Sequence, residues 1–72
     1  MTPAQCRAAR ALLNWNQAQL AAAAQVSVTT VRTFETEKSA PQRSTLDVLR
    51  RALEAAGVEF TNGGQPGVRM KG

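Results

Sequence analysis

The chain has 72 residues, one cysteine, no histidine and a formal net charge of +4, with a sequence pI of about 10.7. A chain of this length forms one small domain that buries about 60% of its unfolded surface, so its stability must come from helix packing, a partner subunit or both. This residue content excludes an intrachain disulfide and a zinc site. The lack of a run of about 18 apolar residues excludes a membrane-spanning helix. The basic charge suits a polyanionic partner, although it also serves simply to keep a small protein in solution.

The first helix is predicted to begin at Pro3 and to continue through Leu13. Thr2 provides a hydroxyl cap and Pro3 occupies the first helical position. The apolar positions recur at i, i+3 and i+7, on one face of a helix; they are Cys6, Ala9 and Leu13. Cys6 is interpreted as a small core residue. Trp15, which follows this helix, is interpreted as a partly buried side chain that packs between the first two helices. The alternative is that it stacks on a nucleic-acid base.

A second helix is predicted over residues 17–24. Asn16 can cap this helix, and Gln19 follows three residues later, which is the spacing of a capping box. The four consecutive alanines at its end, residues 21–24, are small enough to let another helix approach closely.

The third predicted helix runs from Val28 to about Thr36, with Ser27 as its cap. It is rich in β-branched residues, which propensity alone would assign to a strand. The spacing of Val31 and Phe34 favours a helix instead, and the polar run around them does not alternate as a half-buried strand would. Such a conflict, between the helical spacing of apolar residues and the strand propensity of the residue types, often marks a functional surface.

A fourth helix is predicted after a loop over residues 37–43. Ser44 is expected to cap it, with Asp47 at the third position, and Gly57 is expected to end it in a left-handed conformation. The apolar stripe of this helix consists of Leu46, Leu49, Ala52, Leu53 and Ala56.

The last part of the chain alternates apolar and polar residues over 58–60 and 68–71, around turn-forming residues 62–67. This pattern predicts two short strands. An isolated two-stranded hairpin is barely stable in water, so it must pack on the helices or pair with another chain. We expect it to form the dimer contact, through Val58, Phe60, Val68 and Met70. The alternative is a hairpin that folds over its own fourth helix.

Residues 17–34 resemble the helix-turn-helix of the phage-repressor and Cro-like (XRE) family, and the resemblance covers about residues 4–57. Ala21 lies where the two helices of that motif cross, and its buried positions are held by Leu20, Ala24, Val26, Val31 and Phe34. One position differs, because the family usually has glycine at the turn and this chain has Gln25. A positive φ at Gln25 would cost about 1 kcal/mol.

The outer edge of the third helix carries methyl groups, hydroxyls and one guanidinium. A helix fits the DNA major groove, and its first turns reach the base edges. We therefore expect base contacts from Val28, Thr29, Arg32 and Thr33. Arg32 suits a guanine and the methyl groups suit thymine, each good contact giving about 1–3 kcal/mol of discrimination. The alternative is an ordinary polar helix face, and Thr30 is assigned to neither group.

Contacts with the DNA backbone are expected around this helix. Gln17 lies in the first turn of the second helix, where free amides suit a phosphate, and the resemblance gives this glutamine that role. Ser27 is expected to combine capping with a phosphate contact. The resemblance places further backbone contacts at Thr36, Lys38 and Arg43. The alternative for Lys38 and Arg43 is that both side chains are simply solvated. A further alternative for Arg43 is that it enters the minor groove.

The resemblance implies a mainly α, lambda-repressor-like domain of four helices at residues 1–57, followed by a short C-terminal strand or hairpin at residues 58–72. It also implies a structural ion pair between Arg10 on the first helix and Glu35 at the end of the third. Removing one partner of such a pair costs about 3–5 kcal/mol when the pair is buried.

The expected function is sequence-specific binding of double-stranded DNA by a transcriptional regulator, as a homodimer on a two-fold site. The expected location is the cytoplasm of a bacterial or phage-type system, at the nucleoid. No cofactor, metal or membrane contact is expected. Enzymatic activity is not expected either, because the chain offers no histidine and no paired carboxylates. The alternative is a protein-interaction module with the same fold, such as an antitoxin or an adaptor, whose helix-turn-helix mainly binds another protein. The C-terminal strand is a further candidate site for a protein partner.

Overall fold

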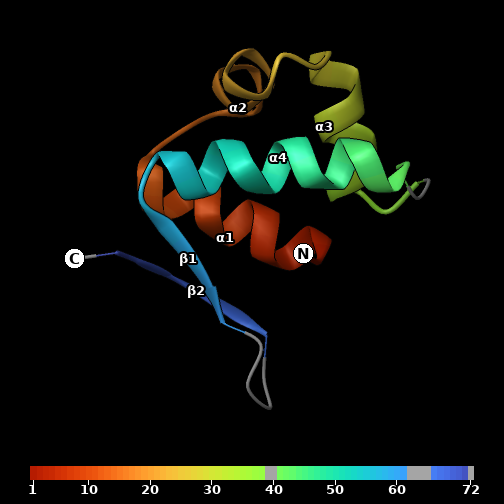
Figure 1. Ribbon diagram of the computed structural model, residues 1–72. Coiled ribbons are helices and arrows are strands. Elements are labelled where there is room, and N and C mark those ends of the chain that lie inside the picture. Colours follow the sequence, from red (N-terminus) through yellow and green to blue (C-terminus); the bar gives the residue numbers. More distant parts are fainter. Residues whose placement is uncertain (39–40, 62–65, 72) are drawn as a thin grey trace.

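The computed structural model describes residues 1–38, 41–61 and 66–71. Within them the chain forms a bundle of helices followed by an antiparallel hairpin (Figure 1). The elements are α1 (Pro3–Leu13), α2 (Gln17–Ala24), α3 (Val28–Glu35), α4 (Arg43–Ala55), β1 (Val58–Thr61) and β2 (Gly67–Met70). This confirms the predicted fold class. None of the helices in these described ranges has the length and apolar content that crossing a membrane requires.

The first three helices begin where the sequence predicts, because a side chain caps each of them. Thr2 Oγ1 accepts a hydrogen bond from the Gln5 amide at 3.1 Å. Asn16 Oδ1 accepts from the Gln19 amide at 2.7 Å, and Gln19 Oε1 accepts from the Asn16 amide at 2.8 Å, which completes the expected capping box. Ser27 Oγ accepts from the Thr30 amide at 3.1 Å. Each of these caps contributes about 1 kcal/mol to helix stability.

The cap predicted at Ser44 is wrong. The Gln42 carbonyl accepts hydrogen bonds from the amides of Thr45 and Leu46, at 3.0 and 3.1 Å, so α4 has already begun at Arg43. Ser44 is therefore a helical residue and lacks the extended backbone that a cap needs. Gln42 holds the capping position, and its side chain makes no cap hydrogen bond. Gly57, expected from the sequence to end α4 in a left-handed conformation, does follow this helix with a positive φ of 108°.

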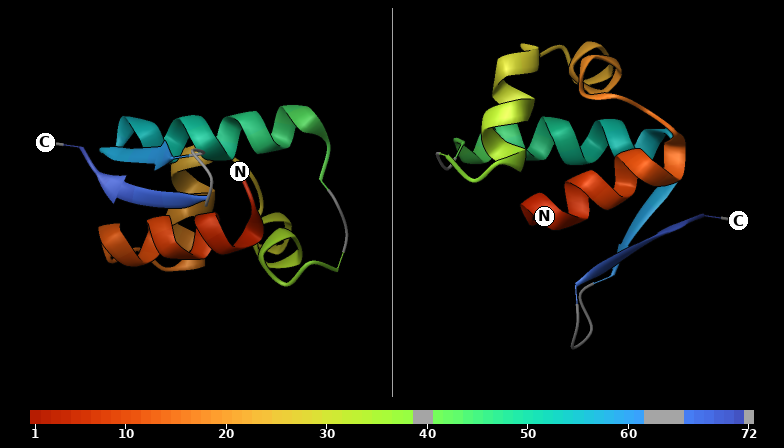
Figure 2. Two further views of the ribbon diagram at one scale, coloured as in Figure 1. Left: turned by 90° about the horizontal axis from the view of Figure 1, so that it is seen from below. Right: turned by 180° about the vertical axis from the view of Figure 1, so that it is seen from behind.

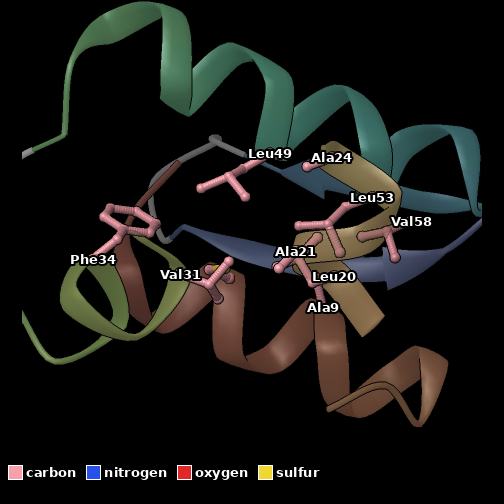
Figure 3. Close-up of a cluster of buried hydrophobic side chains, with 10 residues drawn as sticks. Ala9, Leu20, Ala21, Ala24, Val31, Phe34, Leu49, Leu53 and Val58 are labelled. Atoms are coloured by element: carbon pink, nitrogen blue, oxygen red, sulfur yellow. The ribbon is translucent and has the colours of Figure 1, made fainter. Parts of the chain in front are cut away.

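The core lies where the four helices and β1 meet (Figure 3). Leu20, Val31, Leu49 and Leu53 are fully buried, and burying each such side chain contributes about 1.5–3 kcal/mol. The small side chains at the end of α2 let this helix pack against both α3 and α4. Burial of Val31 and Phe34 also explains why the β-branched α3 is helical, since that spacing places both side chains in the core.

The hairpin packs on α1 and α4, on the opposite side of these helices from α2 and α3 (Figures 1 and 2). Val58 pairs with Met70 and Phe60 with Val68 in its antiparallel register. Gln5 Nε2 on α1 donates to the carbonyl oxygens of Thr61 and Gly67, at 3.4 and 3.1 Å. The hairpin is thus folded onto its own helices.

Candidate nucleic-acid interface

A tight turn at Gln25 joins α2 to α3. Gln25 has φ 59° and ψ 43°, the left-handed conformation that glycine adopts at low cost. Two hydrogen bonds close the end of α2 around it, from the Gln25 amide to Ala22 O at 3.3 Å and from the Val26 amide to Ala21 O at 3.0 Å. Gln25 therefore takes a positive φ, which costs about 1 kcal/mol of conformational free energy.

Helix α3 presents two different faces. Val31 and Phe34 point into the core, while Thr29 and Arg32 are exposed and Thr33 is half-buried. Arg32 forms no ion pair among the described residues, so its guanidinium has no intramolecular competitor for a base. Thr29, Arg32 and Thr33 thus lie together on the open face.

Val28, the fourth predicted base contact, is half-buried and packs partly against the core. Thr30 is also half-buried, and its Oγ1 lies 2.8 Å from Ser27 Oγ. Val28 consequently presents less surface to a ligand than Thr29 and Arg32, which are exposed.

A hollow of about 250 Å³ separates α3 from the start of α4. Thr29, Thr30, Thr33 and Phe34 line one wall of this hollow, and Pro41, Gln42 and Thr45 line the other. The residues of the second wall were not among the predicted contacts. The polar side chains of Gln42 and Thr45, on either side of Arg43, are a sequence signal that could have indicated this wall.

The predicted backbone contacts fall into two groups. Gln17, Ser27 and Thr36 have hydrogen-bond partners within the chain. For Thr36 these are the carbonyl oxygens of Arg32 and Thr33, which accept from its hydroxyl at 2.8 and 3.4 Å. Lys38 and Arg43 are exposed cations on either side of residues 39–40, which lie outside the described residues. Cations in such positions suit phosphate groups.

The carboxylate of Glu35, which is 2% exposed, accepts four hydrogen bonds from α1 and α2. Arg10 donates through Nε to Oε2 at 2.6 Å and through Nη2 to Oε1 at 2.7 Å. Gln17 Nε2 donates to Oε1 at 3.1 Å, and Cys6 Sγ donates to Oε2 at 3.2 Å. We call these four residues the Glu35 cluster. The structure thus brings Arg10 and Glu35 together as a largely buried pair.

The electrostatics of the Glu35 cluster favour one protonation pattern. Burial alone would raise the pKa of Glu35, but hydrogen bonds from Arg10, Gln17 and Cys6 outweigh it, so this pKa is lowered. The bond to Glu35 raises the pKa of Arg10. Burial, together with the bond to Glu35, raises the pKa of Cys6 to about 12. The thiol is therefore protonated at neutral pH and acts as a hydrogen-bond donor.

Arg10 also connects the cluster to the segment before α2, because its Nη1 donates to the Trp15 carbonyl oxygen at 3.0 Å. Arg7, one turn earlier on α1, donates to the carbonyl oxygen of Glu35. A cation at the end of a helix also interacts favourably with the helix dipole. The end of α3 is therefore fixed to α1 at both its backbone and its side chain.

The dimer contacts predicted in the hairpin differ in accessibility. Val58 is 1% exposed and belongs to the core, whereas Met70 is 45% exposed. Phe60 and Val68 are half-buried, and the guanidinium of Arg50 lies over the Phe60 ring at 5.5 Å from its centroid. Met70 and the outer strand edges are thus the parts that a second chain can reach.

An α-helix such as α3 is about 10–12 Å in diameter with its side chains, and the major groove of DNA is about 12 Å wide, so the helix fits into the groove. Its open face carries the donor and methyl groups that base edges recognise. A family model described as Helix-turn-helix matches residues 7–60, which include α2, α3 and the turn between them. None of the curated proteins matches this chain. The chain belongs to the XRE-type helix-turn-helix family, a family of DNA-binding transcription regulators.

Proposed function

We propose that this protein is a sequence-specific transcriptional regulator that binds double-stranded DNA as a homodimer on a two-fold site, with α3 in the major groove. The observation that carries the proposal is the division of α3 into two faces. Val31, Phe34 and Glu35 are buried, so the orientation of the helix is fixed. Its open face is then held ready for a ligand, and little ordering remains to be done when DNA binds.

Base recognition is proposed for Thr29, Arg32 and Thr33, with a smaller contribution from Val28. An arginine forms two parallel hydrogen bonds with guanine O6 and N7, and threonine methyl groups contact the methyl group of thymine. We therefore expect a half-site with one important guanine and neighbouring A·T pairs.

Phosphate contacts are proposed for Lys38, Arg43, Ser27 and Thr36, and for the backbone amides at the start of α2. These contacts set the position of the domain on DNA without selecting a sequence. Charge neutralisation by the two cations also makes binding dependent on salt, because each neutralised phosphate releases a counterion.

Selection of bound fragments from genomic DNA, followed by gel shifts at several salt concentrations, tests this function. We expect a palindromic motif with half-site centres about 34 Å apart, or a multiple of that distance. Arg32→Ala is expected to weaken binding to the selected site by about 1–3 kcal/mol. Arg51→Ala is the matched control, because Arg51 is an exposed arginine of α4 that belongs to neither the proposed DNA contacts nor the proposed dimer contact. Weak binding without sequence preference would contradict the proposal and favour a protein-interaction module.

The dimer contact is proposed for the hairpin, whose outer edges offer backbone groups to a second chain. Truncation after Gly57 is a poor test, because it removes the buried Val58 from the core. Met70→Glu is sharper, since it adds charge to an exposed side chain. Leu12→Glu on α1 is a control of equal exposure, as Met70 and Leu12 are 45% and 44% exposed. Sedimentation is expected to show a dimer for the wild type and Leu12→Glu and a monomer for Met70→Glu, and an unchanged mass for Met70→Glu would contradict the hairpin contact.

A further inference from the structure

The Glu35 cluster is the place where α1, α2 and α3 are joined by polar contacts. Each carboxylate oxygen of Glu35 has two donors. Oε2 accepts from Arg10 and Cys6, and Oε1 accepts from Arg10 and Gln17. Gln17 is the member of this set that belongs to α2. A carboxylate this deeply buried depends on every donor, because a missing hydrogen bond inside a protein is not replaced by water.

The side chain of Gln17 is not needed to cap α2. Asn16 and Gln19 already satisfy the start of that helix through their capping box. The orientation of the Gln17 amide is also determined by its surroundings. Only the NH₂ end can face a carboxylate, since a carbonyl oxygen there would be repelled. One hydrogen of Gln17 Nε2 is therefore committed to Glu35.

We propose that Gln17 is a positioning residue for the recognition helix, which acts through Glu35 rather than mainly through a side-chain contact with phosphate. This inference rests on the proposed DNA-binding function. Its bond to Glu35 ties the first residue of α2 to the last residue of α3, across the turn at Gln25. The same glutamine thus sets where the amides at the start of α2 lie relative to the base-contacting face of α3.

Without this bond, the angle between α2 and α3 depends on the strained turn at Gln25, on apolar contacts, and on Arg10. Arg10 bonds both Glu35 and the Trp15 carbonyl oxygen, but it holds the segment before α2 rather than α2 itself.

The apolar contacts come from Leu20, Ala21 and Ala24 of α2, which belong to the same core cluster as Val31, and apolar contacts lack the directionality of a hydrogen bond. The phosphate-binding amides and the base-contacting residues must engage one duplex together, so a change in this angle weakens binding even when every contact residue is intact.

The first test compares the melting temperatures of Gln17→Glu and Gln19→Glu in the absence of DNA. Both variants add the same charge to the first turn of α2, where the helix dipole favours it. Glutamate at position 19 can still complete the capping box. Glutamate at position 17 instead faces the carboxylate of Glu35. We expect Gln17→Glu to melt about 5–10 °C lower than Gln19→Glu at pH 7.

The pH profile adds a readout that a general loss of packing would not produce. Two carboxylates that share a site cannot both remain ionised without repulsion, so the pKa of one of them is raised. The gap between the two variants is therefore expected to narrow as the pH falls from 7 to 5. Equal melting temperatures at pH 7 would overturn the proposal, as would a gap that does not change with pH.

The second test uses Gln17→Met, which keeps the length of the side chain and removes the donor. We expect two effects below the melting transition: an affinity for the selected DNA lowered about tenfold, and shifted backbone amide NMR resonances in α3 without DNA. Lower affinity with unshifted α3 resonances would assign Gln17 to phosphate contact and overturn the proposal. If no variant binds a specific DNA, the proposed function fails, while the DNA-free comparison still decides whether Gln17 positions α3.

Discussion

The Glu35 cluster and the C-terminal hairpin both attach to α1, but different forces hold them. The carboxylate of Glu35 is 2% exposed and accepts hydrogen bonds from two other helices. The hairpin is held by one fully buried side chain, Val58, and by the partly buried Phe60 and Val68, which pack against the core. Gln5 adds hydrogen bonds to two backbone carbonyls of the hairpin. Its own ion pair, between Arg69 and Glu59, is exposed to solvent.

This difference shows which region requires one arrangement of its side chains. A buried charge is strongly destabilising when it loses a partner, so the cluster tolerates a single geometry, and that geometry orients α3. An exposed ion pair contributes about 0–1 kcal/mol, so the Arg69–Glu59 pair of the hairpin can be lost at low cost. The orientation of the recognition helix is thus the more strictly specified of the two.

The largest expected effect comes from Glu35→Ala, which leaves Arg10 buried without its partner. We expect a loss of about 3–5 kcal/mol in unfolding free energy, measured by urea denaturation, together with weaker DNA binding. Glu54→Ala is the control, because Glu54 forms an exposed pair with Arg50 at 3.3 Å, and it should cost less than about 1 kcal/mol. A melting temperature unchanged by Glu35→Ala would contradict the structural role of the pair.

Lowering the pH is expected to reduce the stability that the Glu35 cluster provides, and to do so gradually. The pKa of Glu35 is lower in the folded protein than in the unfolded chain, so the unfolded state binds more protons as the pH falls below the ordinary glutamate pKa of about 4.3. The stability that the carboxylate provides is complete above that pH and is lost toward the lower, folded pKa. Glu35→Gln should show a shallower loss of stability over this acid range in thermal melts, and parallel curves would argue against the pKa shift.

In the hairpin, Val58→Ala is expected to cost about 1.5–3 kcal/mol, because Val58 is a fully buried side chain whose methyl groups leave a cavity. Met70 is the residue that pairs with Val58 across the two strands, and its side chain is exposed. Met70→Ala should therefore lower the unfolding free energy by about 0.5 kcal/mol or less. Urea denaturation of both variants measures the difference. Similar losses for both would mean that the hairpin acts as one unit rather than through a single anchor.

The smallest effect is expected at the turn between α2 and α3. Gln25→Gly should stabilise the protein by about 0.5–1 kcal/mol, because glycine adopts the observed left-handed conformation without strain. The same change at the helical and exposed Ala22 should destabilise it by about 1 kcal/mol. Thermal melts that move in the same direction for both variants would argue against strain at Gln25.

Local features of this protein were predictable from short stretches of sequence. The capping residues Thr2, Asn16 and Ser27 act on amides three positions away, so their partners lie within the same segment. Ser44 shows where local reasoning fails. It has a suitable side chain, but the path of the chain through the preceding loop decided which residue remains extended, and that residue is Gln42.

The sequence by itself determined the four helices, the two strands and the buried positions of α3, because hydrophobic periodicity and capping are properties of neighbouring residues. The tertiary structure decided the rest. It made Val58 part of the helical core, added Pro41, Gln42 and Thr45 to the hollow beside α3, and turned Gln17 and Cys6 toward Glu35. Such contacts join residues far apart in the chain, and their geometry depends on how the helices pack rather than on any segment alone.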